Sequence, residues 1–286
     1  MRTKRARDTR LLEFSQQLLR LHAEAATARR AGRPAFRLPD FYIIGAPRCG
    51  TTWLKRTLAA HRDILMLSGE PFAFTRHLDG SPEAGLQRYV PTAENFLLGG
   101  KFDPDRYDRF LVGEKSPDYF TMAPRRLRFF LDANPQARFI LLCREPSERL
   151  WSHLRHKFAE APDAIDALLA ASSVEDLRHR HPRVWRFIGR NQKFGFYRDA
   201  IDAWRGSVPP ERFLTISFHD IAAASDRVAR AVVEFLGVPG DGLDFGNLPA
   251  PRGGSAPIEP PGYLVAWMRD LYGDDEPACV ASLPRL

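Results

Sequence analysis

Cysteine is scarce in this sequence, and long apolar runs are absent. The three cysteines, Cys49, Cys143 and Cys279, are too few and too scattered for a disulfide framework, and their spacing suits no metal site. No apolar stretch approaches the roughly 18 residues that a membrane span requires. The N-terminus also lacks the apolar core of a secretory signal. These absences predict reduced thiols in a cytoplasmic protein without a transmembrane anchor, while peripheral contact with a membrane stays open.

The composition instead supplies apolar residues and positive charge. With 286 residues, of which 44% are hydrophobic, the chain can bury one sizeable core or two small ones. Its 42 basic and 35 acidic residues give a formal net charge of +7. A basic protein attracts anionic partners, which include nucleotides, acidic or sulfated glycans, nucleic acid and membrane surfaces. Net charge alone does not choose among these partners.

The first 34 residues form a basic block that differs in composition from the rest. Within residues 1–34, leucines and one phenylalanine recur at roughly helical spacing among many arginines. We expect a solvated helix that packs by one face, although a surface-binding or partner-binding arm would show the same pattern. The tripeptide Gly32-Arg33-Pro34 then interrupts the helical pattern. The sequence therefore predicts a basic helical extension over 1–34 and one domain over 35–286.

Beyond the extension, short apolar runs alternate with amphipathic segments. Such runs are typical of buried parallel strands, and they occur at 41–44, 64–67, 110–112, 138–143 and 213–218. The segments between them repeat their apolar residues with helical periodicity. Strands that alternate with helices predict an α/β fold, here a three-layer P-loop-like domain whose central parallel sheet is flanked by helices.

The first predicted strand leads into a glycine-rich loop, Gly45–Thr52. A glycine turn between a buried strand and a helix points backbone N–H groups at an anion, and the helix dipole adds to the attraction. The two glycines have the spacing of a kinase P-loop, but Thr51-Thr52 stands where that motif has Lys followed by Ser or Thr. The positive charge lies inside the loop instead, at Arg48. The loop therefore suits an anion of lower terminal charge than a triphosphate with Mg²⁺.

A second candidate anion site follows the strongest predicted strand. Arg144 lies at the carboxyl end of that strand, the edge where open α/β sheets bind ligands, and an arginine there suits a dianionic phosphate. Ser152 lies on the following helix, on its polar side together with Arg149. A surface pair between Arg144 and Glu145 or Glu148 is the alternative interpretation.

Together, these segments resemble the sulfotransferases that use 3′-phosphoadenosine 5′-phosphosulfate (PAPS), especially the heparan sulfate sulfotransferases and their bacterial relatives. The resemblance covers nearly the whole domain, and its best match is the run from Arg48 to Thr52, with Arg where the family usually has Lys. Arg keeps the charge but never deprotonates, so it can stabilise a leaving phosphate without acting as an acid. The resemblance implies PAPS as co-substrate, no metal, and a PAPS site formed by Arg48, Cys49, Gly50, Thr51, Thr52, Trp53, Arg144, Ser152 and a C-terminal loop with Arg252, Gly253 and Gly254.

The resemblance also implies a catalytic set on two further loops. Glu70 follows the second predicted strand and matches a family glutamate that we expect to act as general base for the acceptor. Gly69 and Phe72 replace the Lys and His that accompany this glutamate in the glycan-specific branch. Lys115, after the third predicted strand, closely matches a family segment. It is expected to approach the transferring sulfuryl group and to neutralise developing charge together with Arg48.

Several other side chains are secondary candidates. Histidines offer an alternative base, and His77 is favoured among them because it follows Glu70 on the same loop. The other three histidines are His61, His153 and His156. Two residues near Lys115 are expected to line the acceptor cleft or to pack, namely Asp118 and Tyr119. Two aromatic residues of a helix expected over 195–204 are interpreted as core rather than as a platform for adenine, namely Tyr197 and Trp204.

The predicted function is transfer of a sulfuryl group from PAPS to a hydroxyl or amine of a carbohydrate, glycolipid or small metabolite. A P-loop kinase is the nearest alternative, but the chain has no Lys after Gly50 and no Asp at the strand end. A nucleic-acid-binding protein is an alternative from another class, but no recognition helix, zinc finger or RNA-binding strand pair is present. The sequence specifies neither the acceptor nor the oligomeric state, and it leaves O- and N-sulfation open.

Overall fold

The computed structural model describes residues 2–250 and 258–273. Within that part of the chain, five parallel strands form a single sheet in the order β2-β3-β1-β4-β5. The strands are Phe41–Gly45 (β1), Ile64–Met66 (β2), Leu111–Lys115 (β3), Arg138–Cys143 (β4) and Phe213–Ser217 (β5). The predicted α/β fold with a central parallel sheet is confirmed.

Each strand lies where an apolar run predicted one. In the centre of the sheet, Phe41 of β1 pairs with Gly113 of β3 on one side and with Arg138 of β4 on the other. The last strand, β5, stops one residue earlier than predicted. Phe218 begins the next helix instead, because Ser217 caps that helix by accepting a hydrogen bond from a backbone N–H.

Helices cover both faces of the sheet and extend beyond it. Those next to the sheet are α2 (Thr51–Ala60), α4 (Pro124–Ala133), α9 (Arg198–Arg205), α10 (Phe218–Ala223) and α11 (Ser225–Leu236). A further group comprises α5 (Pro146–Lys157), α6 (Pro162–Ala170), α7 (Val174–Arg180), α8 (Pro182–Asn191) and α12 (Gly262–Tyr272). The others include α1 (Arg2–Arg30), α3 (Pro82–Gln87) and the short helices η1 (Ala73–His77), η5 (Tyr119–Thr121) and η6 (Gln192–Gly195).

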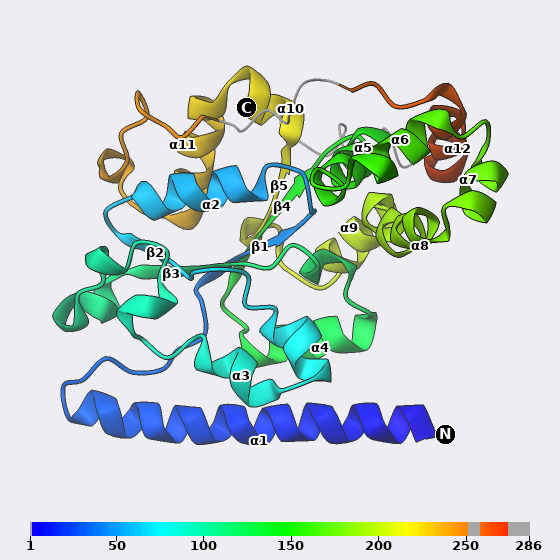
Figure 1. Cartoon of the computed structure of the whole chain (residues 1–286). Helices are drawn as coiled ribbons and strands as arrows, with labels where there is room; N and C mark the ends of the chain where they lie inside the picture. Colours follow the sequence, from blue (N-terminus) through cyan, green and yellow to red (C-terminus); the bar gives the residue numbers. More distant parts are fainter. Residues whose placement is uncertain (1, 251–257, 274–286) are drawn as a thin grey trace.

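The sheet lies between two helical layers, with α2 and α11 above it and α4 below it in Figure 1. Aromatic rings fill the lower face. Tyr42 of β1 packs edge-on against Phe130 of α4, with ring centroids 4.8 Å apart, and Phe139 of β4 lies 4.9 Å from Trp204 of α9. Trp204 and Tyr197 are almost completely buried, which confirms the prediction that both are core residues. These large rings bury much of the apolar area on this face of the sheet.

A second hydrophobic cluster lies among α5, α7, α8 and α12. It includes the completely buried residues Leu150, Leu154, Leu177, Ile188 and Leu264. Arg149 of α5 is also completely buried, and its guanidinium donates to the Asn191 carbonyl at 2.8 Å. The prediction that Arg149 lies on a polar side of the helix was therefore wrong, because α8 and η6 cover that side.

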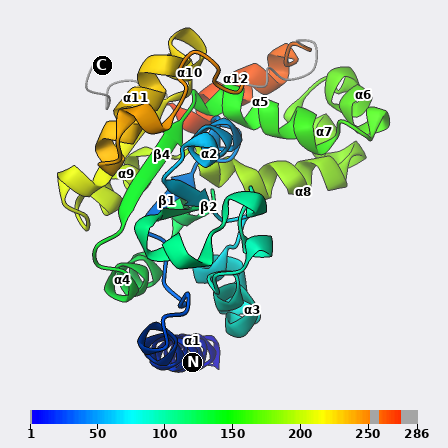
Figure 2. The same ribbon diagram turned by 90° about the vertical axis from the view of Figure 1, so that its left-hand side faces the viewer.

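Helix α1 lies outside the three layers, along α3 and α4 at the bottom of Figures 1 and 2. Its Phe14 is completely buried, and the ring lies 5.0 Å from Phe74 of η1 and 5.6 Å from Phe129 of α4. On the opposite face, Leu12 and Leu19 are exposed. α1 thus packs by one face on the segments that follow β2 and β3. No helix in residues 2–250 and 258–273 is long and apolar enough to cross a membrane.

Gly113 of β3 has no room for a side chain. A Cβ at this position would lie 2.2 Å from the Phe41 ring and 2.6 Å from the Met66 sulfur. We expect Gly113→Ala to lower the free energy of unfolding by about 1–3 kcal/mol, the usual cost of overpacking a core. Thermal unfolding measures this change. The matched control is Gly189→Ala on α8, where a Cβ meets nothing within 4 Å and alanine favours the helix. Equal Tm values for the two variants would contradict the packing argument.

Candidate functional site

The glycine loop Gly45–Thr52 joins β1 to α2 and is packed tightly through its backbone. A Cβ on Gly45 would lie 2.3 Å from the Phe120 ring. Gly50 has a left-handed conformation, with φ of 87°, at the start of α2, and such a conformation favours glycine. Arg48 also has a positive φ, of 72°. This backbone places the N-terminus of α2 at the carboxyl edge of the sheet, a position that attracts anions.

Arg48 lies among other positive groups. Its Nε donates to Ser152 Oγ of α5 at 3.4 Å, so two residues that were predicted from separate motifs are neighbours. Burial, together with the nearby Arg144 and Arg155, lowers the pKa of the Arg48 guanidinium below its ordinary value. Like charges at close range repel one another, and an anion placed among them relieves that repulsion. This arrangement suits a bound phosphate.

Arg144 follows β4 at the sheet edge and is 22% exposed. Its Nε donates to Glu148 Oε2 at 3.0 Å, which is the pairing that the sequence offered as an alternative. Its guanidinium also lies 4.5 Å from the centre of the Phe218 ring. Together with Ser152, Arg144 lines a pocket of about 630 Å³ between α5 and α12, within the size range of ligand sites. A phosphate bound to Arg144 would share it with Glu148 or displace that carboxylate.

Glu70 and Lys115 meet beside the glycine loop. Lys115, at the end of β3, is nearly buried, and its Nζ lies 2.5 Å from Glu70 Oε1. The same ammonium donates to the Thr52 hydroxyl at 3.2 Å. The Glu70 side chain remains 36% exposed, so an incoming group can reach the carboxylate. Three segments far apart in the sequence thus bring together a carboxylate, a cation and a hydroxyl, a combination suited to group transfer.

A buried network fixes the loop that carries Glu70. The carboxylate of Glu114 is completely buried and accepts hydrogen bonds from the hydroxyls of Ser116 and Tyr89, each at 2.6 Å. Burial raises the pKa of Glu114 to about 6. Ser116 in turn accepts a hydrogen bond from the backbone N–H of Phe72 at 2.9 Å. Ser116, directly after β3, therefore holds the Glu70 loop two residues beyond Glu70.

Lys55 of α2 was not among the predicted site residues, although it is nearly buried next to the Glu70 loop. Its Nζ donates at 2.5 Å to the carbonyl of Gly69, the residue before Glu70. Burial and then the neighbouring Lys115 lower the pKa of Lys55 to about 8. The sequence contained one indication that Lys55 is buried, namely its position beside the apolar residue Leu54 in α2. A lysine is rarely buried unless it has partners.

Cys49, Thr51 and Trp53 have largely buried side chains. The Cys49 sulfur lies 3.5 Å from the Tyr197 hydroxyl. These side chains therefore pack inside the protein. The part of these residues that a ligand can contact is the backbone, whose N–H groups lie at the start of α2. The hydroxyl of Thr52, in contrast, belongs to an exposed residue beside Lys115.

Two tryptophans hold the chain near the predicted C-terminal phosphate loop. Three predicted residues of that loop lie outside the described residues, namely Arg252, Gly253 and Gly254. On one side of this segment, Trp53 Nε1 donates to the Pro249 carbonyl at 2.8 Å. On the other side, Trp151 Nε1 donates to the Ile258 carbonyl at 2.7 Å. The flanking residues are thus fixed to α2 and α5, the two helices that carry Thr52 and Ser152.

The histidines proposed as alternative bases occupy different environments. His61 is completely buried, and its ring hydrogen-bonds a backbone carbonyl, so it is a core residue. Burial and then Arg149 lower the pKa of His153 to about 3, which makes its imidazole a weak base. The neighbouring Arg48 and then burial lower the pKa of His156 below its ordinary value. His77 ends η1 and stays the histidine that follows Glu70 most closely along the chain.

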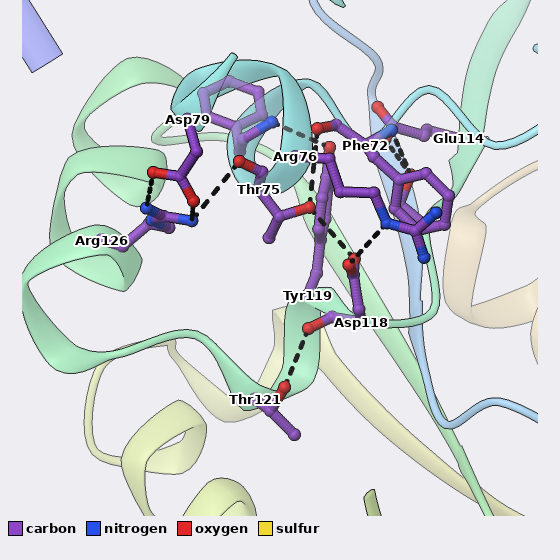
Figure 3. Close-up of polar contacts among 11 residues, drawn as sticks. Phe72, Thr75, Arg76, Asp79, Glu114, Asp118, Tyr119, Thr121 and Arg126 are labelled. Atoms are coloured by element: carbon purple, nitrogen blue, oxygen red, sulfur yellow. Dashed lines mark hydrogen bonds and ion pairs between the residues drawn. The ribbon is translucent and has the colours of Figure 1, made fainter. Parts of the chain in front are cut away.

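Asp118 and Tyr119 lie in different environments, although the sequence predicted the same two alternatives for both, lining the acceptor cleft or packing. Tyr119 is completely buried, and its hydroxyl accepts a hydrogen bond from the Phe74 N–H at 3.1 Å, so it packs. Asp118 accepts a hydrogen bond from the Thr75 hydroxyl at 3.1 Å and lies 3.5 Å from Arg76 Nε. Figure 3 shows this group, in which Arg76 lies between Phe72 and Asp118. Asp118 thus lines an open pocket together with Thr75 and Arg76, whereas Tyr119 belongs to the core.

Comparisons with known proteins agree with the predicted resemblance. A protein-family model described as "Sulfotransferase domain" matches residues 38–244. The chain is 26% identical over 209 residues to heparan sulfate glucosamine 3-O-sulfotransferase 6 of Mus musculus, a match that covers 71% of this chain and 53% of that protein. It is 28% identical over 206 residues to bifunctional heparan sulfate N-deacetylase/N-sulfotransferase 3 of Homo sapiens, covering 71% of this chain and 22% of the relative. The chain thus spans about half of the first relative and about a fifth of the second.

Among solved structures, the fold is similar to that of a sulfotransferase from Alicyclobacillus acidocaldarius. The TM-score is 0.55, the sequence identity is 24%, and the match covers 86% of this chain and 95% of that one. This likeness shows a shared fold for nearly the whole length of both chains.

Proposed function

Since the chain belongs to the sulfotransferase family, we propose that it transfers a sulfuryl group from PAPS to a hydroxyl or amine of an acceptor. The observation that carries the proposal is the cluster of Glu70, Lys115 and Thr52, in which one ammonium contacts both the carboxylate and the hydroxyl. The comparisons give the alternative of a P-loop kinase no support.

PAPS would lie across the carboxyl edge of the sheet. Its 5′-phosphosulfate suits the glycine loop, where Arg48 and the N-terminus of α2 attract negative charge. Its 3′-phosphate suits the region of Arg144 and Ser152, whose cationic character is evident from the lowered pKa of Arg48. The pocket between α5 and α12 lies next to this region and has room for part of the nucleoside. No metal is required by this placement, because arginine and lysine supply the positive charge.

In the reaction, the acceptor oxygen or nitrogen attacks sulfur, and the bond between sulfur and the bridging phosphate oxygen breaks. The leaving group is adenosine 3′,5′-bisphosphate (PAP), which keeps the bonding electron pair. Glu70 accepts the proton of the acceptor. Lys115 and Arg48 neutralise charge on the transferring group and on the leaving phosphate. The Thr52 hydroxyl and the loop N–H groups position the sulfuryl group.

The acceptor class that we propose is a carbohydrate, glycolipid or small metabolite. The support is the sequence similarity to proteins whose names specify heparan sulfate, together with an open, largely basic pocket lined in part by Thr75 and Arg76, which follow Glu70 along the chain.

Incubation with PAPS labelled in its sulfuryl group tests the proposal directly. A panel of sugars, acidic oligosaccharides, phenols and lipids is offered as acceptors, and the labelled product is identified. We expect acceptor-dependent release of PAP without added Mg²⁺, and no phosphate transfer from ATP. Binding of PAP with no labelled product from any acceptor would favour a nucleotide-binding role, and ATP turnover would favour a kinase.

The role of Lys55 gives a separate prediction. We expect Lys55→Met to lower kcat about tenfold at pH 7, because the Gly69 carbonyl loses its donor and Glu70 is held less accurately. The wild-type ammonium loses its proton as the pH rises through about 8, so the ratio of wild-type to variant kcat should shrink between pH 7 and 9. Lys157→Met, at the exposed end of α5, is the control for loss of one charge. A ratio that does not change with pH would show that the Lys55 charge has no role.

A further inference from the structure

A second open pocket, of about 790 Å³, lies where α1 meets η1, η5 and α4. Arg10 and Leu11 of α1 form part of its wall. These two residues lie outside the segment 38–244 that matches the sulfotransferase family. The buried ring of Phe14, one turn further along α1, fixes the helix against Phe74 and Phe129. The N-terminal helix therefore adds a fixed wall to the family's domain, and the space it encloses is large enough for a sugar-sized ligand.

The lining of this pocket carries more positive than negative charge. Five basic residues line it, namely Arg10, Arg76, Arg125, Arg126 and Lys193, and two acidic ones, Asp79 and Asp118, which leaves an excess of three positive charges. Arg126 pairs with Asp79 through two contacts of 2.6 and 3.1 Å, which Figure 3 shows, and Arg125 pairs with Asp8 of α1. Among the described residues, Arg10 and Lys193 form no ion pair within 4.0 Å. Lys193 Nζ lies 4.9 Å from the centre of the Phe194 ring, a cation–π contact that leaves its N–H groups able to bind an anion. The side chains of Arg10 and Lys193 can therefore both contact an anionic ligand.

The pocket begins where the two catalytic loops end. Asp118 is three residues beyond Lys115, and Arg76 is six residues beyond Glu70. Arg76 joins the two loops, because its guanidinium lies 3.7 Å from the centre of the Phe72 ring and its Nε lies 3.5 Å from Asp118. Three residues span at most about 10 Å, so the Cα of Asp118 in the pocket wall lies no further than that from the Cα of Lys115.

We propose that this pocket is a subsite for an anionic group of the acceptor, such as a carboxylate or sulfate, and that Arg10 is a specificity-determining residue. The proposal rests on the proposed sulfotransferase function. The anionic group lies at a distance from the hydroxyl or amine that receives the sulfuryl group, and it binds to Arg10 and Lys193. An acidic oligosaccharide is then held in register with Glu70, whereas a neutral oligosaccharide of equal length gains nothing from the pocket.

The experiment compares two probes, a hexasaccharide that carries uronate carboxylates and the same hexasaccharide after reduction of its carboxyl groups. Binding is measured by calorimetry on the full chain with PAP present, for wild type, Arg10→Ala, Arg10→Glu and Lys193→Ala. We expect each alanine variant to bind the acidic probe about tenfold more weakly and Arg10→Glu to bind it weaker still. The reduced probe should bind all four proteins equally weakly. The matched control is Arg20→Ala, which removes an exposed arginine from the same helix outside the pocket and should bind like wild type.

Arg10 is itself exposed, so its substitution should leave the Tm and the affinity for PAP unchanged. Equal binding of the acidic probe by wild type, Arg10→Ala and Arg20→Ala would overturn the proposal. So would equal wild-type affinity for the acidic and the reduced probe. These outcomes are distinct from failure of the proposed function, which would appear as absence of PAP binding or of PAPS turnover. In that case the two probes are compared without PAP, and the same differences between variants decide whether the pocket binds anions.

Discussion

Replacing Glu70 by Gln should lower kcat by about 10²–10⁴-fold, the usual contribution of a positioned general base. The amide keeps the size of the side chain and can still accept a hydrogen bond from the Lys115 ammonium, which lies 2.5 Å from the carboxylate in the wild type. It cannot accept a proton from the acceptor. The affinity for PAP should stay within about twofold of the wild-type value, since Arg48, Arg144 and Ser152, which are proposed to hold the two phosphates, stay in place.

Steady-state release of PAP in the presence of acceptor measures kcat, and calorimetry measures PAP affinity. The control is Glu175→Gln, which removes the same charge from an exposed site on α7 and should leave both quantities unchanged. If Glu70→Gln turns over at the wild-type rate with PAP affinity intact, another group takes the proton. His77 would then be the next candidate, because His61 is buried in the core and His153 is a weak base.

The sequence predicted those features of the fold that depend on residues close together along the chain. Each buried strand has a continuous apolar run, and the glycine loop and Arg144 directly follow two of them. In a parallel sheet, residues that follow the strands come to one edge. The proximity of Glu70 to Lys115 could thus be expected, before any contact was known, because Glu70 follows β2 and Lys115 ends β3.

The contacts that hold Glu70 depend instead on residues far apart in the sequence. Lys55 reaches a carbonyl 14 residues away, and Ser116 binds the N–H of a residue 44 positions before it. No local pattern determines such distances. The same limit explains Arg149, whose position on α5 looked polar because the sequence of one helix does not show that α8 and η6 cover it.

The N-terminal helix shows the same limit at a larger scale. Its heptad-like leucines and arginines predict an amphipathic helix but not the surface on which it packs. Only the structure shows that Phe14 inserts beside Phe74, on the segment that follows Glu70. The basic extension therefore forms one wall of a pocket whose other walls include Arg76 and Asp118, which follow Glu70 and Lys115 along the chain.

Arg48 gives the second large expected effect. Arg48→Ala should lower kcat/KM for PAPS by about 10²–10³-fold, because the transferring group and leaving phosphate lose a preorganised cation. The neighbouring cations Arg144 and Arg155 stay in place, so a reduced affinity for PAP is expected rather than none. The control is Arg56→Ala, an exposed arginine of α2, which should behave like wild type.

Arg48→Lys separates charge from geometry at the same position. Lysine keeps the positive charge but lacks the Nε that donates to Ser152 at 3.4 Å. If charge alone matters, Arg48→Lys should recover activity to within a few-fold of wild type and Ser152→Ala should have little effect. If the bond to Ser152 fixes the guanidinium, Arg48→Lys and Ser152→Ala should show similar partial losses, and the double variant should lose no more than either alone. If Arg48→Ala is as active as Arg56→Ala, neither the charge of Arg48 nor its bond to Ser152 contributes to catalysis. The glycine loop would then act without its one internal cation.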